Sequence, residues 1–278
     1  MQKVQSTWEL IPCAKAYIVL SMEKRIFAIG DIHGELNALE TLIDSLELTE
    51  KDELVFLGDY VDKGPQSKEV LDYLIDLQEK YDCTFVRGNH EEFMLYVIDE
   101  EEFVELFWGR HGGAQTLKSY GVEDCDELRE VLPEAHKTFL RNTVDAHETD
   151  THVFVHAGWH PERTLEEQSV NTLRYRFLSA TKSEMEFDKK VICGHSSIQS
   201  GHPAVKDHIT CVDTVENGWL TAYDLTNEKF YQASLDGQTR EMDKAETFNE
   251  KRHVPEFAWR ENIEKLEQQR KKRHNGPK

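Results

Sequence analysis

Five short apolar runs in this chain each stop at a glycine or alanine that lies next to side chains able to bind a metal ion. The runs end in GDIHG at 30–34, GDYVDKG at 58–64, GNHE at 88–91, HAG at 156–158 and GH at 194–195. Ligands of an open α/β sheet collect beyond the carboxyl ends of its strands, where glycine lets the backbone turn sharply and approach a ligand closely. The repetition therefore predicts that these side chains converge on one crevice.

Each of these motifs alone has a simpler explanation. Asp31 precedes a helical pattern and is a good helix-capping residue. A single histidine such as His156 or His195 is more often structural than a ligand. Five strand ends that all carry Asp, His or Asn are hard to attribute to turn chemistry, so we interpret them together as a metal site.

The spacing of apolar residues predicts alternating strands and helices in the first third of the chain. Strands are expected at 25–29, 53–57 and 83–86, and helices at 36–46 and 67–81, where apolar residues recur at helical spacing. Three strand–loop–helix units in succession predict an α/β fold with a parallel or mixed sheet and flanking helices.

The rest of the chain divides into a helical insertion, further strands and a polar end. Residues 91–150 are acidic and helical in pattern. Strand patterns then return at 151–155, 190–193, 209–213, 219–225 and 229–234, the last two joined by a hairpin. We therefore expect one domain over 23–235, between a dispensable leader or misassigned start at 1–22 and a charged, partly helical extension at 236–278.

The charge and the cysteines of the chain exclude several classes of function. A formal net charge of -20 argues against broad binding to nucleic acid or to an anionic membrane, because both require a basic footprint. The five cysteines form no C-x-x-C pair, which disfavours a disulfide framework or a structural zinc site and favours a reducing cytoplasm. The apolar patch AYIVL near the N-terminus is too short to span a bilayer.

The types of candidate ligand indicate which metals would bind. Carboxylate, imidazole and amide oxygen without thiolate suit Mn²⁺, Fe or Zn²⁺ in a catalytic role. Two such ions about 3.5–4 Å apart, bridged by a carboxylate and a hydroxide, make a good site for hydrolytic phosphoryl transfer.

The same five motifs, in the same order, resemble the signature of the phosphoprotein phosphatase-type metallophosphoesterases. This family includes serine/threonine protein phosphatases and symmetrical diadenosine tetraphosphatases. The resemblance covers 25–233, and FWGRHGGAQTLKSYG at 107–121 further resembles the compact bacterial members. It implies a β-sandwich of two mixed sheets with helices on both outer faces.

The resemblance also implies a centre of two divalent ions, with manganese as the expected metal and iron or zinc as alternatives. One ion would be held by Asp31, His33 and Asp59, and Asp59 would bridge to the second. The other ligands of the second ion would be Asn89, His156 and His195.

The same resemblance assigns the acid of the reaction. His90 would protonate the leaving alkoxide after attack by the metal-bridging hydroxide, and Asp62 would orient its imidazole.

Phosphate recognition is where the chain departs from the family. Lys63 occupies the position of a phosphate-binding arginine, and lysine cannot form the planar bidentate fork of arginine. Arg87 is expected to support the site from its strand end and to help bind the substrate. Arg174 aligns best with a second phosphate-binding arginine and Arg176 is the near alternative, although a surface ion pair explains Arg174 equally well.

These features predict a metal-dependent phosphoric ester hydrolase whose substrates are phosphoserine or phosphothreonine in proteins, or small phosphoesters. A dinucleoside polyphosphate hydrolase is the second enzymatic hypothesis, and Lys63-Gly64-Pro65 favours it. A catalytically inactive binding module is the hypothesis from another class, and the intact His90–Asp62 pair disfavours it.

Overall fold

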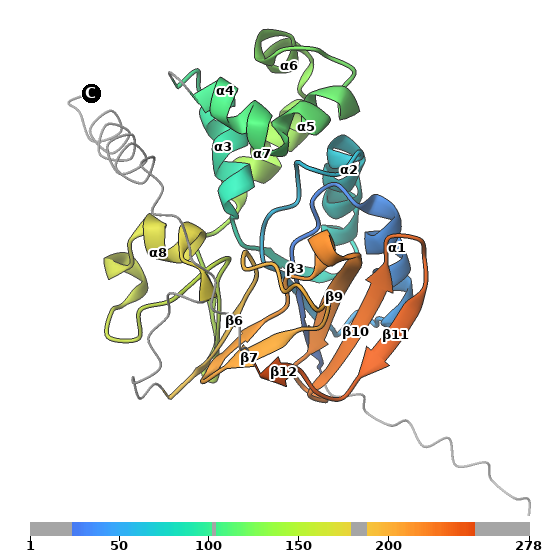
Figure 1. The fold of residues 1–278 in the computed structure, drawn as a ribbon, viewed down its shortest axis with the longest axis vertical. Coiled ribbons are helices and arrows are strands. Elements are labelled where there is room, and N and C mark those ends of the chain that lie inside the picture. The colour runs from blue at the N-terminus through green and yellow to red at the C-terminus, as the bar shows by residue number, and fades with distance from the viewer. Residues whose placement is uncertain (1–23, 102–103, 179–187, 248–278) are drawn as a thin grey trace, which may run out of the picture.

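Two six-stranded mixed sheets face each other in the computed structural model, which describes residues 24–101, 104–178 and 188–247 (Figure 1). The first sheet has the order β11-β10-β9-β1-β2-β3 and contains β1 (Ile26–Ile29), β2 (Glu53–Phe56), β3 (Asp82–Phe85), β9 (Trp219–Asp224), β10 (Lys229–Ser234) and β11 (Thr239–Met242). The second has the order β12-β7-β8-β6-β5-β4 and contains β4 (His147–Glu148), β5 (His152–Phe154), β6 (Lys190–Cys193), β7 (Ala204–Lys206), β8 (Ile209–Cys211) and β12 (Glu246–Thr247). The expected two-sheet fold class is confirmed.

Apolar side chains from the two sheets meet in a core between them. Successive residues of a strand point to opposite faces of its sheet. In β1, Ala28 accordingly joins the core between the sheets, while Phe27 and Ile29 belong to the core on the outer face. The second sheet contributes Phe154 and Ile192 to the core between the sheets. The sandwich is thus held together by apolar burial on both faces of the first sheet.

Helices cover the outer faces of the sandwich. On the first sheet lie α1 (Leu36–Ser45), which packs on β9 and β10, and α2 (Ser67–Gln78), which packs beside β3. The short helix α8 (Val170–Tyr175) packs Leu173 into the apolar cluster of the second sheet. Both helices expected in the first third of the chain are confirmed, and the second ends at Gln78, where the chain turns to enter β3.

A group of helices stands at one end of the sheets, where the expected insertion lies (Figure 1). It comprises α3 (Asn89–Ile98), α4 (Val104–Trp108), the π-helical turn η1 (Gly109–Gly113), α5 (Ala114–Ser119), α6 (Cys125–Val131) and α7 (Glu134–Asn142). Among the described residues, the 3-10 turns η2 (Leu165–Glu167) and η4 (Val215–Asn217) lie in loops of the second half. Within the described ranges, no helix combines the length and the apolar composition needed to cross a membrane.

The fold continues past the expected domain end at residue 235. Strand β11 pairs with β10, and β12 pairs with β7, so residues 239–247 add an edge strand to each sheet. Edge strands are often polar because they are exposed to solvent. The sequence TREM of β11 contains no apolar run, so its strand could not be predicted from the hydrophobic pattern. The expected boundary was therefore too early. The predictions for 1–22 and for the end of the 236–278 extension lie outside the described residues.

Candidate active site

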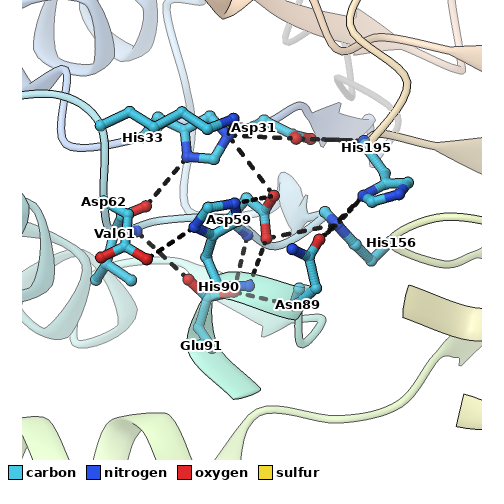
Figure 2. Close-up of polar contacts among 12 residues, drawn as sticks. Asp31, His33, Asp59, Val61, Asp62, Asn89, His90, Glu91, His156 and His195 are labelled. Atoms are coloured by element: carbon cyan, nitrogen blue, oxygen red, sulfur yellow. Dashed lines mark hydrogen bonds and ion pairs between the residues drawn. The ribbon is translucent and has the colours of Figure 1, made fainter. Parts of the chain in front are cut away.

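Three parallel strands from each sheet point their carboxyl ends toward the same region. Strands β1, β2 and β3 run parallel in the first sheet, as do β5, β6 and β8 in the second. The structure brings together the side chains that follow these strands (Figure 2): Asp31, His33, Asp59, Asp62, Asn89, His90, His156 and His195. The predicted convergence on one region is confirmed.

The turns that carry these side chains have unusual backbone conformations. The non-glycine residues with left-handed φ angles of 48° to 73° in this region are His33, Asp59, Asp62, Lys63 and His195. Such conformations cost on the order of 1–3 kcal/mol each and persist only where the surrounding structure enforces them. These strained turns lower the stability of the fold, but they orient the side chains toward one another.

Two glycines let the backbone pass directly behind the carboxylates. A Cβ atom at Gly88 would collide with Oδ1 of Asp59, and one at Gly194 would collide with Oδ1 of Asp31. The sequence motifs GNHE and GH therefore require glycine for close approach. His195 N, next to Gly194, donates to both oxygens of Asp31 at 3.1 and 3.2 Å.

Asp59 lies at the centre of the cluster. Its Oδ2 is 3.6 Å from Nε2 of His33 and 3.9 Å from Nε2 of His90, and its Oδ1 is 3.4 Å from Nε2 of His156. Burial alone would raise the pKa of this carboxyl, but the surrounding imidazoles and the ammonium of Lys63 outweigh burial and lower the pKa. Asp59 is therefore a carboxylate with one oxygen facing each side of the cluster.

Two groups of possible metal ligands share Asp59. One combines it with His33 and His90, and the other with His156 and His195; the donor atoms of each group lie within 4.8 Å of one another. Asn89 adds its Oδ1, 3.0 Å from Nε2 of His156 and 2.9 Å from Nδ1 of His195.

Asp31 stands at the edge of the first group. Its Oδ2 lies 3.9 Å from Nε2 of His33. Its buried carboxyl has a raised pKa because of burial and the nearby charges of Asp213 and Asp59.

The histidines of the cluster are held in the form that binds metals. Nδ1 of His33 lies 3.1 Å from the Val61 carbonyl and Nδ1 of His156 lies 2.8 Å from the Leu57 carbonyl. A carbonyl only accepts, so Nδ1 carries the proton and Nε2 is left with its lone pair toward the cluster. Burial lowers the pKa of both imidazoles, and that of His195 falls to about 3 for the same main reason.

The donor set fits a pair of divalent cations. Nε2 of His156, which keeps its lone pair, lies 3.0 Å from Oδ1 of Asn89 and 3.4 Å from Oδ1 of Asp59, so three acceptor atoms crowd together and a cation would relieve their repulsion. Carboxylates, neutral imidazoles and an amide oxygen converge around one shared carboxylate, and such donors suit Mn²⁺, Fe or Zn²⁺.

His90 forms a buried pair with Asp62, as the family resemblance implied. Nδ1 of His90 is 2.7 Å from Oδ2 of Asp62 (Figure 2). Burial opposes the charged imidazolium, but the carboxylates of Asp59 and Asp62 outweigh it and raise the pKa of His90. The geometry leaves Nε2 of His90 facing Asp59.

Side chains from the helical insertion hold Asp62 in turn. Trp108 Nε1 donates to Oδ2 of Asp62 at 2.8 Å, and Thr116 Oγ1 donates to Oδ1 at 2.6 Å. Trp108 and Thr116 lie 46 and 54 residues from Asp62 along the chain, so sequence reasoning did not find them. The insertion therefore completes the surroundings of His90.

Glu91 is a second functional position that had no predicted role. Its buried carboxylate accepts from the backbone N–H groups of Gly88, Asp59 and Tyr60 at 2.7–2.9 Å. Burial and the nearby charge of Asp59 raise its pKa to about 7. Glu91 thereby ties the turn after β2 to the start of α3, and its place in GNHE was the available signal.

The predicted phosphate-binding arginines have partners inside the protein. Arg87 donates to Thr143 Oγ1 at 2.7 Å and to the Arg141 carbonyl at 3.0 Å, at the end of α7. Arg174 forms a buried ion pair with Glu92 at 2.6 Å and another with Asp145. These contacts give both arginines structural roles, and their contact with phosphate stays a prediction.

The alternative arginine lies against one of the motifs. A Cβ atom at Gly158 of HAG would be 3.2 Å from Cβ and Cδ of Arg176. Next in the chain, the Phe177 ring packs 4.8 Å from the His195 ring, between centroids. The segment of Arg176 thus borders the cluster from the side of the second sheet.

A family model described as Calcineurin-like phosphoesterase matches residues 24–228. The chain belongs to the calcineurin-like phosphoesterase family. Calcineurin-like phosphoesterases use a dinuclear centre of divalent metal ions, and the two ligand groups that share Asp59 fit such a centre.

Curated relatives of this calcineurin-like phosphoesterase include bis(5'-nucleosyl)-tetraphosphatases and protein phosphatases. It is 33% identical over 146 residues to a symmetrical bis(5'-nucleosyl)-tetraphosphatase of Pseudomonas syringae pv. syringae, over 50% of this chain and 44% of that protein. It is 25% identical over 231 residues to the asymmetrical bis(5'-nucleosyl)-tetraphosphatase PrpE of Oceanobacillus iheyensis, over 74% and 90%. It is 40% identical over 75 residues to the serine/threonine-protein phosphatase 4 catalytic subunit of Eremothecium gossypii, over 26% and 24%.

The chain thus spans less than half the length of the Pseudomonas and Eremothecium proteins. A solved protein serine/threonine phosphatase from Saccharomyces cerevisiae has a TM-score of 0.53 at 13% sequence identity, over 84% of this chain and 83% of that one. This similarity shows that the two proteins share the fold.

Proposed function

We propose that this calcineurin-like phosphoesterase hydrolyses phosphomonoesters with the help of two divalent metal ions. The observation that supports this proposal most directly is the buried His90–Asp62 pair, whose histidine faces a carboxylate shared by two groups of metal ligands. A proton donor beside a two-metal site is well suited to phosphoester hydrolysis, because the metals activate water and the donor protonates the leaving group.

The metals would be bound by side chains from both sheets. Asp31, His33 and Asp59 would hold one ion, and the ligands of the other would be Asp59, Asn89, His156 and His195. Manganese is our proposed metal, with iron or zinc as alternatives. When bound, the two ions would activate water and neutralise charge on the phosphoryl group.

His90 would supply the proton to the leaving group. Its Nδ1 is fixed by Asp62, so the proton on Nε2 points toward the cluster, where the ester oxygen leaves. General acid catalysis of this kind contributes about 10²–10⁴-fold to the rate.

Phosphoserine and phosphothreonine in proteins, or small phosphoesters, are the proposed substrates. The similarity to the phosphatase 4 catalytic subunit supports this choice. A dinucleoside tetraphosphate is the second candidate substrate, because two relatives named as bis(5'-nucleosyl)-tetraphosphatases match longer parts of the chain. We further propose a cytoplasmic location, which the free thiols of Cys83, Cys125, Cys193 and Cys211 support.

Turnover of three substrates by the Mn²⁺-loaded protein and by its His90→Ala variant tests this proposal. The substrates are a phosphoserine peptide, p-nitrophenyl phosphate and diadenosine tetraphosphate. We expect His90→Ala to lower kcat about 10²–10⁴-fold on the peptide and less on p-nitrophenyl phosphate, whose leaving group needs little protonation. His202→Ala is the control, since His202 is partly exposed and pairs with Glu246.

The outcomes separate the three hypotheses. Cleavage of diadenosine tetraphosphate without turnover of the phosphopeptide would replace the proposed substrate with the second candidate. Stoichiometric metal without turnover of any phosphoester would instead establish a binding module.

A further inference from the structure

Lys63 reaches into the candidate active site and is paired there with an acid from a distant turn. Its Nζ lies 2.9 Å from Nε2 of His33 and forms an ion pair with Oε1 of Glu216. Glu216 belongs to η4, between β8 and β9. The two side chains are 37% and 45% exposed, so the pair lies where the site meets solvent.

The backbone of Lys63 is fixed, but its side chain needs a partner to be fixed as well. Lys63 has a left-handed φ of 66°, and its N–H donates to the Gly112 carbonyl at 3.2 Å. Lysine carries its charge on a flexible four-carbon stem and gains no rigidity from a planar fork. Among the described residues, Glu216 is the acid that forms an ion pair with Nζ.

The neighbouring acids would otherwise draw the ammonium deeper into the cluster. The charges of Glu216, Asp59 and Asp213 all attract Lys63. Asp59 and Asp213 are buried, whereas Glu216 lies at the surface of the site. Contact with Glu216 therefore holds Nζ between the exposed carboxylate of Glu216 and Nε2 of His33, at the edge of the cluster that a phosphoryl group would reach.

We propose that Glu216 is a positioning residue for phosphate binding, which holds the Lys63 ammonium in place and so replaces the rigidity of an arginine fork. An ammonium has three N–H donors, so its bonds to Glu216 and to Nε2 of His33 leave one donor for a phosphoryl oxygen. The inference rests on the proposed function, because it assigns a phosphate group to this side of the site.

A double-mutant cycle on p-nitrophenyl phosphate hydrolysis tests the inference. The Mn²⁺-loaded wild type is compared with Glu216→Gln, Lys63→Arg and the double variant. In the wild-type background we expect Glu216→Gln to raise KM about tenfold and to change kcat less than about threefold, because it weakens binding of the phosphoryl group. In the Lys63→Arg background we expect Glu216→Gln to change KM less than about twofold, because the planar guanidinium fork of arginine is rigid without a partner.

Two results would overturn the inference. A fall in KM on Glu216→Gln would mean that Glu216 competes with phosphate for Lys63. An equal rise in both backgrounds would mean that Glu216 acts independently of Lys63. Glu228→Gln is the matched control, because it breaks the exposed Lys190–Glu228 pair (3.2 Å) at the opposite end of β6, and its KM should equal that of the wild type.

Titration with inorganic phosphate separates this inference from the proposed function. If no variant hydrolyses any phosphoester, the proposed function fails, but phosphate binding to the Mn²⁺-loaded protein is still measurable by calorimetry. The inference would still be supported if Glu216→Gln bound phosphate about tenfold more weakly than the wild type, and if the same substitution had no such effect in the Lys63→Arg background. Equal phosphate binding by wild type and Glu216→Gln would refute it.

Discussion

Asp62 shows how one residue of the site depends on several others. Its fully buried carboxylate accepts hydrogen bonds from Trp108 and Thr116 and contacts His90, and its own N–H donates to Ser67 Oγ at 2.9 Å. A buried carboxylate is costly unless its oxygens have donors. The donors therefore stabilise the charge that orients His90.

Replacing Trp108 by phenylalanine removes one of these donors and keeps most of the ring volume. We expect Trp108→Phe to lower kcat about tenfold on a phosphoserine peptide and to leave metal content unchanged, because supporting hydrogen bonds typically affect activity on this scale. Trp159→Phe is the control, since Nε1 of buried Trp159 has no hydrogen-bond partner among the described residues. Equal kcat values for the two variants would contradict a role of the Trp108–Asp62 bond.

Asp213 is a buried acid behind the candidate metal centre. It is 3% exposed, its charge helps to raise the pKa of Asp31, and its Oδ1 has no hydrogen-bond partner among the described residues. Such an arrangement is typical of a residue that orients a metal ligand.

Asp213→Asn keeps the shape of this side chain and removes its charge. We expect its Kd for Mn²⁺, measured by competition with a chelator, to rise about 10–100-fold. Asp224→Asn provides a matched control, since Asp224 is a buried acid that caps the turn at Thr226 and Asn227. An unchanged Kd in Asp213→Asn would show that Asp213 does not support the metal site.

At the scale of elements, the sequence predicted what apolar patterns and strand ends encode. Strands β1, β2, β3, β5, β6, β8, β9 and β10 coincide with apolar runs, and the cluster residues follow the expected strand ends. Four strands were not predicted. The strands β4 and β7 have only two and three residues, and the edge strands β11 and β12 are polar, so none of them forms a recognisable apolar run. Trp108 and Glu216 reach the site only through the tertiary placement of α4 and η4, which no local pattern encodes.

A chain of hydrogen bonds joins α7, α2 and the end of α5. His136 of α7 contacts Tyr120, just after α5, through Nδ1 at 2.6 Å and Asp72 of α2 through Nε2 at 2.8 Å. Burial lowers the pKa of His136 below the ordinary 6.5, outweighing the opposite effect of Asp72, and the charge of Lys68 lowers it further.

The sign of the pH effect follows from this lowered pKa. Below pH 6.5 the unfolded chain binds the proton of His136 more readily than the folded protein, so the free energy of unfolding decreases as the pH falls. We expect His136→Gln to cost about 1–3 kcal/mol at neutral to alkaline pH through lost hydrogen bonds, and less at acidic pH. Urea unfolding of the Mn²⁺-loaded proteins on both sides of pH 6.5 measures this difference, and an equal cost at both would contradict it.

At the scale of the whole molecule, the net charge opposes the proposed substrates. A formal charge of -20 repels phosphoesters at long range, while the local charge of Lys63 is paired with Glu216. Salt screens the long-range repulsion over a Debye length of about 10 Å at 0.1 M. We therefore expect kcat/KM to rise as KCl increases from about 20 to about 200 mM at constant Mn²⁺, and more for diadenosine tetraphosphate than for p-nitrophenyl phosphate, because the repulsion scales with substrate charge. A kcat/KM that falls with salt would instead mean that a positive local field steers substrates into the site despite the net charge.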